Sequence, residues 1–63
     1  MKDLDNLIAY YRRRSDMYLT QSVKAKKDTD KAYNDGIAEA FEMAAKALEK
    51  VNQNINEKLK ALL

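Results

Sequence analysis

The chain has 63 residues, a net charge of +2 from 12 Lys and Arg against 10 Asp and Glu, one glycine, and no His, Cys, Pro or Trp. Without His and Cys, the usual zinc, haem and iron–sulfur sites, disulfides and cysteine nucleophiles are excluded, so we expect no metal or cofactor. The net charge is too small by itself to indicate a nucleic-acid binder or a polybasic membrane anchor. No apolar run approaches the roughly 20 residues of a membrane span, and the acidic start is unlike a signal peptide. We therefore expect a cytoplasmic protein that does not associate with membranes.

The first half of the chain predicts an amphipathic helix over about residues 3–26. Good helix formers dominate, Pro is absent, and no stretch alternates apolar and polar residues long enough for a strand. Asp3 or Asp5 is expected to cap this helix or to lie in its first turn, where the helix dipole favours negative charge. Apolar or small residues recur at helical spacing on one face. These residues are Leu4, Leu7, Ile8, Tyr11, Ser15, Tyr18, Ser22 and Ala25.

A polar run at residues 26–30 predicts the chain reversal, with the turn at about 27–30. Its basic half suits a helix C-terminus, and its Asp and Thr side chains suit the N-cap of the next helix. Residues 34–36, Asn-Asp-Gly, are the competing turn, because Asn and Gly tolerate left-handed backbone. The first position is favoured, since Tyr33 is in helical register with Ile37 and one Gly inside a helix costs only about 1 kcal/mol.

The second half predicts a helix over about residues 30–61 with a cleaner apolar stripe. The spacing of the stripe alternates three and four residues, which is typical of a helix packed lengthwise on others. Asn54, at the edge of the stripe, is expected to fix the register of that packing, and a plain polar surface residue is the alternative interpretation. The predicted fold is all-α, with residues 1–63 forming a single two-helix antiparallel hairpin.

The two predicted helices differ in length, so the longer one must overhang with Leu59 and Leu62 in water. A two-helix hairpin also leaves much of each apolar stripe uncovered. We therefore expect a homo-oligomer, with a dimer that forms an antiparallel four-helix bundle as the favoured form. The orientation of the two hairpins is left open. The predicted self-association seam consists of Leu4, Leu7, Ile8, Tyr11, Tyr18, Ile37, Phe41, Ala44, Leu48, Val51, Ile55, Leu59 and Leu62.

One shoulder of the first helix is a candidate surface for a foreign protein, because Tyr and Arg often anchor protein interfaces. The residues of this surface are Tyr10, Arg13, Arg14, Met17 and Gln21. Basic residues interleaved with tyrosines can also contact nucleic acid, through Arg12, Arg13, Arg14, Lys24 and Lys27. Consecutive helical residues diverge by 100°, so the three arginines cannot form one phosphate clamp, and nucleic acid is the weaker alternative.

The sequence does not favour a catalytic or calcium-binding role for its serine and acidic residues. Ser15 and Ser22 have no His or positioned Lys to activate them. A calcium loop counted from Asp28 fails at its fifth and sixth positions, which are Ala32 and Tyr33 instead of a ligand and a glycine. We therefore expect a non-enzymatic protein.

Residues 33–42 resemble the second helix of small helical-hairpin accessory proteins encoded by bacteriophages and other mobile elements. The resemblance is carried by Tyr33, Gly36, Ala40 and Phe41, followed by Ala44. It implies an oligomeric accessory protein that binds a host or defence protein. The expected function is accordingly that of a self-associating interaction module, acting as a small inhibitor, and nucleic-acid association is the alternative.

Overall fold

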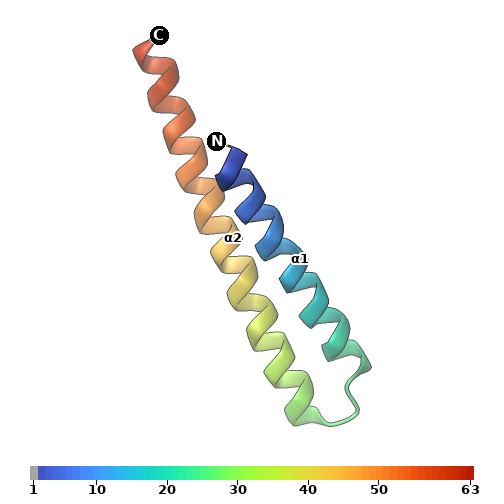
Figure 1. Ribbon diagram of the computed structural model, residues 1–63. Coiled ribbons are helices and arrows are strands. Elements are labelled where there is room, and N and C mark those ends of the chain that lie inside the picture. Colours follow the sequence, from blue (N-terminus) through green and yellow to red (C-terminus); the bar gives the residue numbers. More distant parts are fainter. Residues whose placement is uncertain (1) are drawn as a thin grey trace.

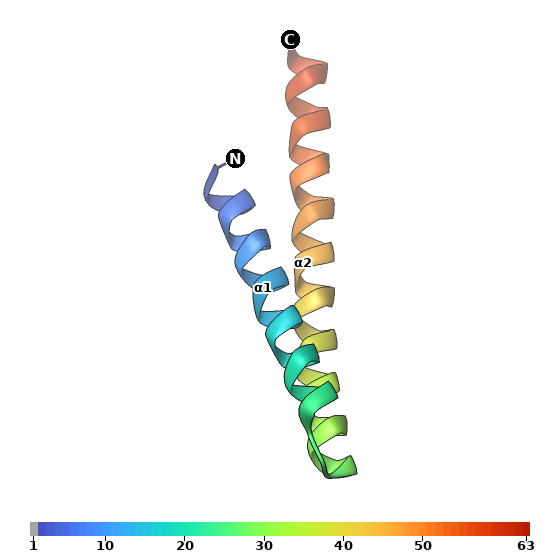
Figure 2. The ribbon, with the colours of Figure 1, turned by 90° about the vertical axis from the view of Figure 1, so that its right-hand side faces the viewer.

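The computed structural model describes residues 2–63 and is an antiparallel pair of helices (Figure 1). Helix α1 spans Lys2–Lys24 and helix α2 spans Asp28–Leu62, and the described residues contain no strand. The two helices cross at a shallow angle (Figure 2). The predicted all-α, two-helix architecture is confirmed.

The reversal occupies residues 25–27, slightly earlier than the predicted turn at 27–30. Helix α1 ends at Lys24, two residues before the predicted end, and the Ala25 amide donates a hydrogen bond to the Ser22 carbonyl oxygen at 3.2 Å. This bond, three residues back along the chain, tightens the final turn and ends the helix. Helix α2 can then start at Asp28.

Both helices begin with acidic residues in the first turn, Asp3 and Asp5 in α1 and Asp28 and Asp30 in α2. Negative charge at these positions opposes the positive end of the helix dipole. The N-cap residue of α2 is Lys27, which is extended and makes no side-chain capping bond. The predicted capping role of the acids after it is therefore wrong, because they already lie inside the helix.

The competing turn at residues 34–36 does not form. Gly36 lies within α2, and no glycine in residues 2–63 has a positive φ. The Asn34 side chain donates to the Asp30 carbonyl oxygen at 2.9 Å, one helical turn back. The only glycine is thus an ordinary helical residue.

Replacing Gly36 by alanine is expected to stabilise the hairpin by about 1 kcal/mol, because Gly is a poor helix former. A Cβ atom at this position meets nothing within 4 Å, so no clash opposes the gain. Urea unfolding followed by circular dichroism at fixed protein concentration measures the change. The exposed Ala32→Gly variant in the same helix should lose a similar amount. A loss of stability in Gly36→Ala would contradict a helical backbone at this position.

Small residues line the contact between the helices. The buried residues are Ile8, Ser15 and Ser22 in α1 and Ala38 and Ala45 in α2, and no large side chain among the described residues is fully buried. Small side chains let the two backbones approach closely.

Two serine hydroxyls bridge the helices directly. The Ser15 hydroxyl donates to the Ala38 carbonyl oxygen at 2.9 Å, and the Ser22 hydroxyl donates to the Lys31 carbonyl oxygen at 3.3 Å. Each of these two hydroxyls therefore has a hydrogen-bond acceptor in the contact between the helices, where water cannot serve as one. Both serines hold α1 against α2.

The face of α2 that packs on α1 is rotated relative to the predicted stripe. It runs through Ala38, Phe41, Ala45 and Leu48, which are buried or half-buried. Ile37, Ala44 and Val51, which belong to the predicted seam, lie about 60–100° away on the flank of this face. The prediction merged two adjacent rows, because both are apolar and a sequence does not indicate which row meets α1.

Asparagine takes part in the helix contact at a different position from the one predicted. The Asn52 side chain donates to an Asp5 carboxylate oxygen at 3.1 Å, whereas Asn54 is exposed. The register role assigned to Asn54 is therefore wrong for the hairpin. Position 52 lies on the α1-facing side of α2, and position 54 lies on its outer side.

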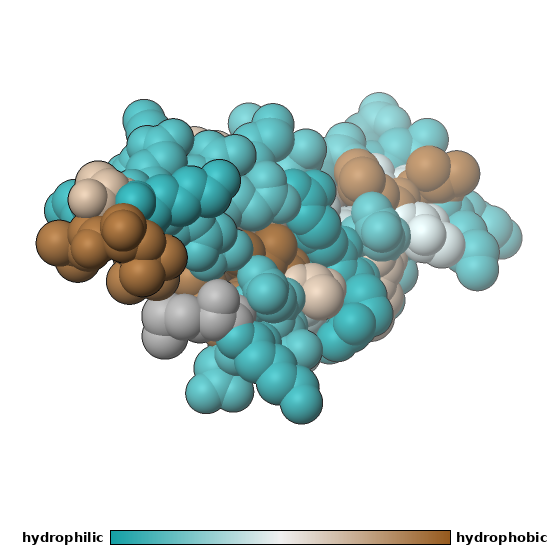
Figure 3. Space-filling view, turned by 90° about the horizontal axis from the view of Figure 1, so that it is seen from above, coloured by the Kyte–Doolittle hydropathy of each residue, from teal (hydrophilic) through white to brown (hydrophobic). Residues whose placement is uncertain are grey.

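Helix α2 projects beyond the first residues of α1 (Figure 1). It has 35 residues against 23 in α1, and the molecule measures 54 × 15 × 11 Å. In the projecting part, Leu59 is 53% exposed and Leu62 is 83% exposed. Apolar side chains gather at this tip when the molecule is seen from above (Figure 3).

Candidate interaction surface

The hairpin has two unlike long sides. The line along which the two helices touch divides the surface of each helix into two flanks. In an antiparallel pair, side chains that are offset from this line in the same rotational direction about their own helix axes lie on the same side of the pair. On one side, Arg12 forms an ion pair with Glu49 across the helices. The Arg12 guanidinium donates a hydrogen bond to the Glu49 carboxylate, and this bond raises the pKa of Arg12. Glu42 and Lys46 pair on the same side at 3.5 Å. We call this the charged side.

The opposite side, which we call the apolar side, carries side chains from both helices. Its residues are Leu7, Tyr10, Arg14 and Met17 of α1 and Tyr33, Ile37, Ala40, Ala44 and Val51 of α2. Several of these are large and well exposed, with Tyr33 at 70% and Val51 at 49%. Exposed apolar side chains gathered on one side of a molecule are typical of an interaction surface.

A cluster of aromatic rings joins the helices at this side. The Phe41 ring of α2 lies 5.7 Å from the Tyr11 ring and 5.8 Å from the Tyr18 ring, measured between centroids, and it stacks on Tyr18. Tyr10 extends the cluster, with its ring 5.8 Å from that of Tyr11. These distances are within the range in which aromatic pairs attract beyond simple burial.

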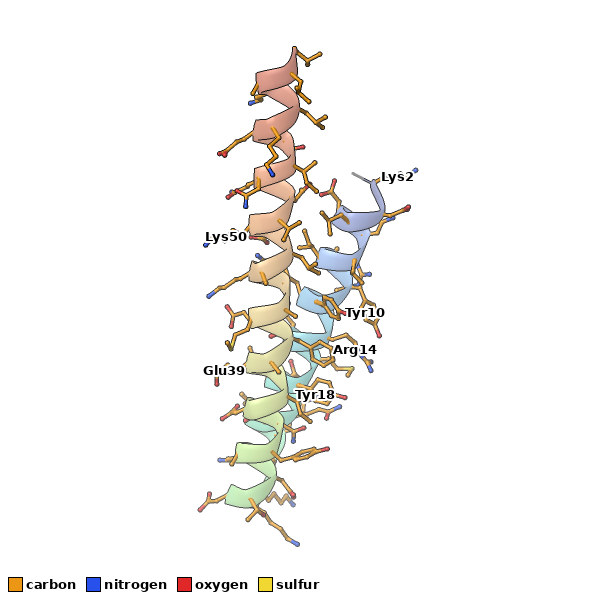
Figure 4. All side chains as sticks on the ribbon, turned by 90° about the vertical axis from the view of Figure 1, so that its left-hand side faces the viewer. Lys2, Tyr10, Arg14, Tyr18, Glu39 and Lys50 are labelled. Carbon is orange, nitrogen blue, oxygen red and sulfur yellow. The ribbon has the colours of Figure 1, made fainter. Side chains whose placement is uncertain are left out.

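Arg14 lies between two of these rings. Its guanidinium carbon is 5.8 Å from the ring centroid of Tyr10 and 5.8 Å from that of Tyr18, one helical turn to either side. Figure 4 shows the three side chains one above another along α1. Both cation–π contacts hold the arginine against the helix. Its Nη1 also lies 3.9 Å from the Met17 sulfur.

The predicted partner surface falls on the apolar side and its outer edge. Tyr10 and Met17 are 45% and 38% exposed, Arg13 and Gln21 are exposed, and Arg14 is half-buried between the tyrosines. The structure thus brings these five residues along one edge of α1. The position of Arg14 between the rings of Tyr10 and Tyr18 was not predicted, although the spacing of these residues at four-residue intervals is a usable signal.

The predicted nucleic-acid contacts are not brought together. Arg12 is on the charged side and is paired with Glu49, whereas Arg14 is on the apolar side between tyrosines. Lys24 ends α1 and Lys27 lies in the turn. A continuous basic groove along α1 does not result from this placement.

The predicted self-association seam divides into three groups. Ile8 is buried, and Leu4, Tyr11, Tyr18, Phe41 and Leu48 are half-buried along the α1–α2 contact. Ile37 and Ala44 are half-buried on the flank, beside the exposed Leu7 and Val51. Ile55, Leu59 and Leu62 lie toward or within the projecting end of α2. The last two groups remain open to a further partner.

Residues 2–63 contain no group of three or more acidic, His or Cys side chains placed to hold a metal ion, and they form no pocket. Neither described helix combines the length and the apolar character that a bilayer crossing requires.

Comparison with family models, curated proteins and solved structures finds no match to this chain.

Proposed function

We propose that this protein is a non-enzymatic interaction module that self-associates as a dimer and presents the edge of α1 to a larger protein. The observation that carries the proposal is the large apolar area left open on one side of the hairpin and at the tip of α2. The charged side, which holds both ion pairs, is a less suitable interface.

The accessible area supports self-association. A compact chain of 7.3 kDa exposes about 4,200 Å², whereas this hairpin exposes 5174 Å², an excess of about 1,000 Å². A standard protein interface buries about 800 Å² on each partner. The excess is therefore comparable with the area that one partner buries in a standard interface.

Sedimentation equilibrium tests the self-association. We expect a mass of twice 7.3 kDa, and a monomer for the double variant Leu59→Ser and Leu62→Ser. Both leucines lie beyond α1, so the variant should remain helical. The matched control is Leu19→Ser with Val23→Ser, which removes two other exposed aliphatic side chains and should remain dimeric. A helical monomer of the unaltered protein at all concentrations would refute the proposal.

The larger partner is proposed to be a host or defence protein, on the strength of the resemblance to phage accessory proteins. Tyr10, Arg13 and Met17 offer an aromatic, a cationic and a flexible apolar group on one edge. The double variant Arg13→Glu and Met17→Ala should lose a captured host protein that the Leu19→Ser and Val23→Ser control keeps. Binding of a DNA duplex that weakens steeply with salt would favour the nucleic-acid alternative instead.

A further inference from the structure

We propose that the dimer forms through α2 in one antiparallel register, with Ala44 opposite the partner's Val51 and Ala40 opposite the partner's Ile55. The inference rests on the proposed self-association and specifies the partner as a second copy. A two-fold axis then passes between Ala47 and Leu48 of each chain. This register uses the flank of α2 that α1 leaves open.

Side-chain sizes along this flank favour the antiparallel register. In its middle the flank of α2 carries Ala40, Ala44 and Ala47, followed by the larger Val51 and Ile55, and its two ends carry long side chains, Tyr33 and Ile37 at one and Lys58 and Leu62 at the other. Reversing one copy sets Val51 and Ile55 of each chain against Ala44 and Ala40 of the other. The middle of the contact is therefore filled evenly.

A parallel arrangement lacks this match. It would place alanine on alanine at position 44 and isoleucine on isoleucine at position 55. A void around the alanines and crowding around the isoleucines would each cost packing energy. The change in side-chain size between residues 40 and 55 thus distinguishes the two directions.

The register also accounts for the projecting end of α2. Leu62 comes to lie near the partner's Tyr33, which is 70% exposed in the isolated hairpin. Leu59 continues the α1-facing row past the end of α1, so it reaches toward the partner's α1. Lys58 lies on the same flank, at the helical angle of Ala40, and its stem can cover apolar surface while its ammonium reaches water.

The covered area is large enough for such a dimer. A compact protein of twice 7.3 kDa exposes about 6,900 Å², whereas two separate hairpins expose twice 5174 Å². Covering even half of that difference buries about 1,700 Å², which is the size of a standard interface. A contact restricted to the two projecting ends would leave Tyr33, Ile37 and the alanine flank in water.

Cysteine cross-linking of the full chain tests the register, since the protein has no cysteine of its own. Ala44→Cys and Val51→Cys are made as single variants and oxidised in a glutathione buffer, alone and mixed. In the proposed register, identical positions are about 10 Å apart along the axis, which is too far for a disulfide. We expect a covalent dimer from the mixture and none from either variant alone.

Two other results would overturn the register while leaving the proposed self-association intact. A covalent dimer from Ala44→Cys alone indicates parallel helices or an antiparallel register centred on Ala44, and one from Leu59→Cys alone, with none from Ala44→Cys, indicates end-to-end contact. Sedimentation of the reduced variants is measured alongside. A monomer of the unaltered protein would refute both the register and the self-association, whereas a dimer without the mixed cross-link refutes the register only.

Discussion

Replacing Leu48 by aspartate is expected to abolish both helical folding and association. Leu48 is half-buried in the contact between α1 and α2, where a carboxylate would lose water and gain no partner. Truncating a buried leucine alone costs about 2–5 kcal/mol, and this hairpin has a small core to absorb such a loss. Circular dichroism at 222 nm and sedimentation should both report loss of structure.

The control for this substitution is Gln53→Asp, which adds the same side chain on the exposed outer face of α2. It should leave helicity and mass nearly unchanged. Glu49→Lys is a poorer control, because Glu49 pairs with Arg12 and the new lysine would face that arginine. Similar losses from Leu48→Asp and Gln53→Asp would mean that the inner and outer faces of α2 are misassigned.

Replacing Phe41 by alanine is expected to cause the second largest effect, a loss of about 2–4 kcal/mol in the free energy of unfolding. The Phe41 ring is the one that α2 contributes to the aromatic cluster, and it contacts both Tyr11 and Tyr18. Removing it leaves a gap between the helices that the two tyrosines cannot fill. Urea unfolding measures the loss at fixed protein concentration.

Met43→Ala provides the comparison for Phe41→Ala. Met43 is two residues away in the same helix and 63% exposed, so its truncation should change the unfolding free energy by no more than about 0.5 kcal/mol. A comparable loss in the two variants would show that the aromatic cluster contributes no more than a surface side chain. The hairpin would then depend on its small buried residues.

The elements of the fold could be predicted from periodicity and turn chemistry. Helix α1 repeats apolar or small residues every three or four positions, and the polar run before α2 marks the reversal to within a few residues. The exact residues at which the helices begin and end could be predicted less well. The last turn of α1 is closed by the Ala25 amide, a local choice that competes closely with one more helical turn.

The residues of the apolar side could be predicted from the sequence, whereas the way in which they are arranged around the contact between the helices could be predicted only in part. Tyr10, Arg14 and Met17 share an edge because of helical spacing, which a sequence indicates directly. The choice between the two apolar rows of α2 depends on the partner helix. Small residues at Ala38 and Ala45 allow close approach and draw α1 toward that row, whereas the larger Ile37 and Val51 are left on the flank.

The aromatic cluster gives the protein a built-in optical probe. The chain has no tryptophan and four tyrosines, of which Tyr10, Tyr11 and Tyr18 gather around Phe41 while Tyr33 stands apart. Near-ultraviolet dichroism and tyrosine emission therefore report chiefly on the docking of one helix against the other. Far-ultraviolet signals report on helix content, so comparing the two spectral regions separates undocking from unwinding without any added label.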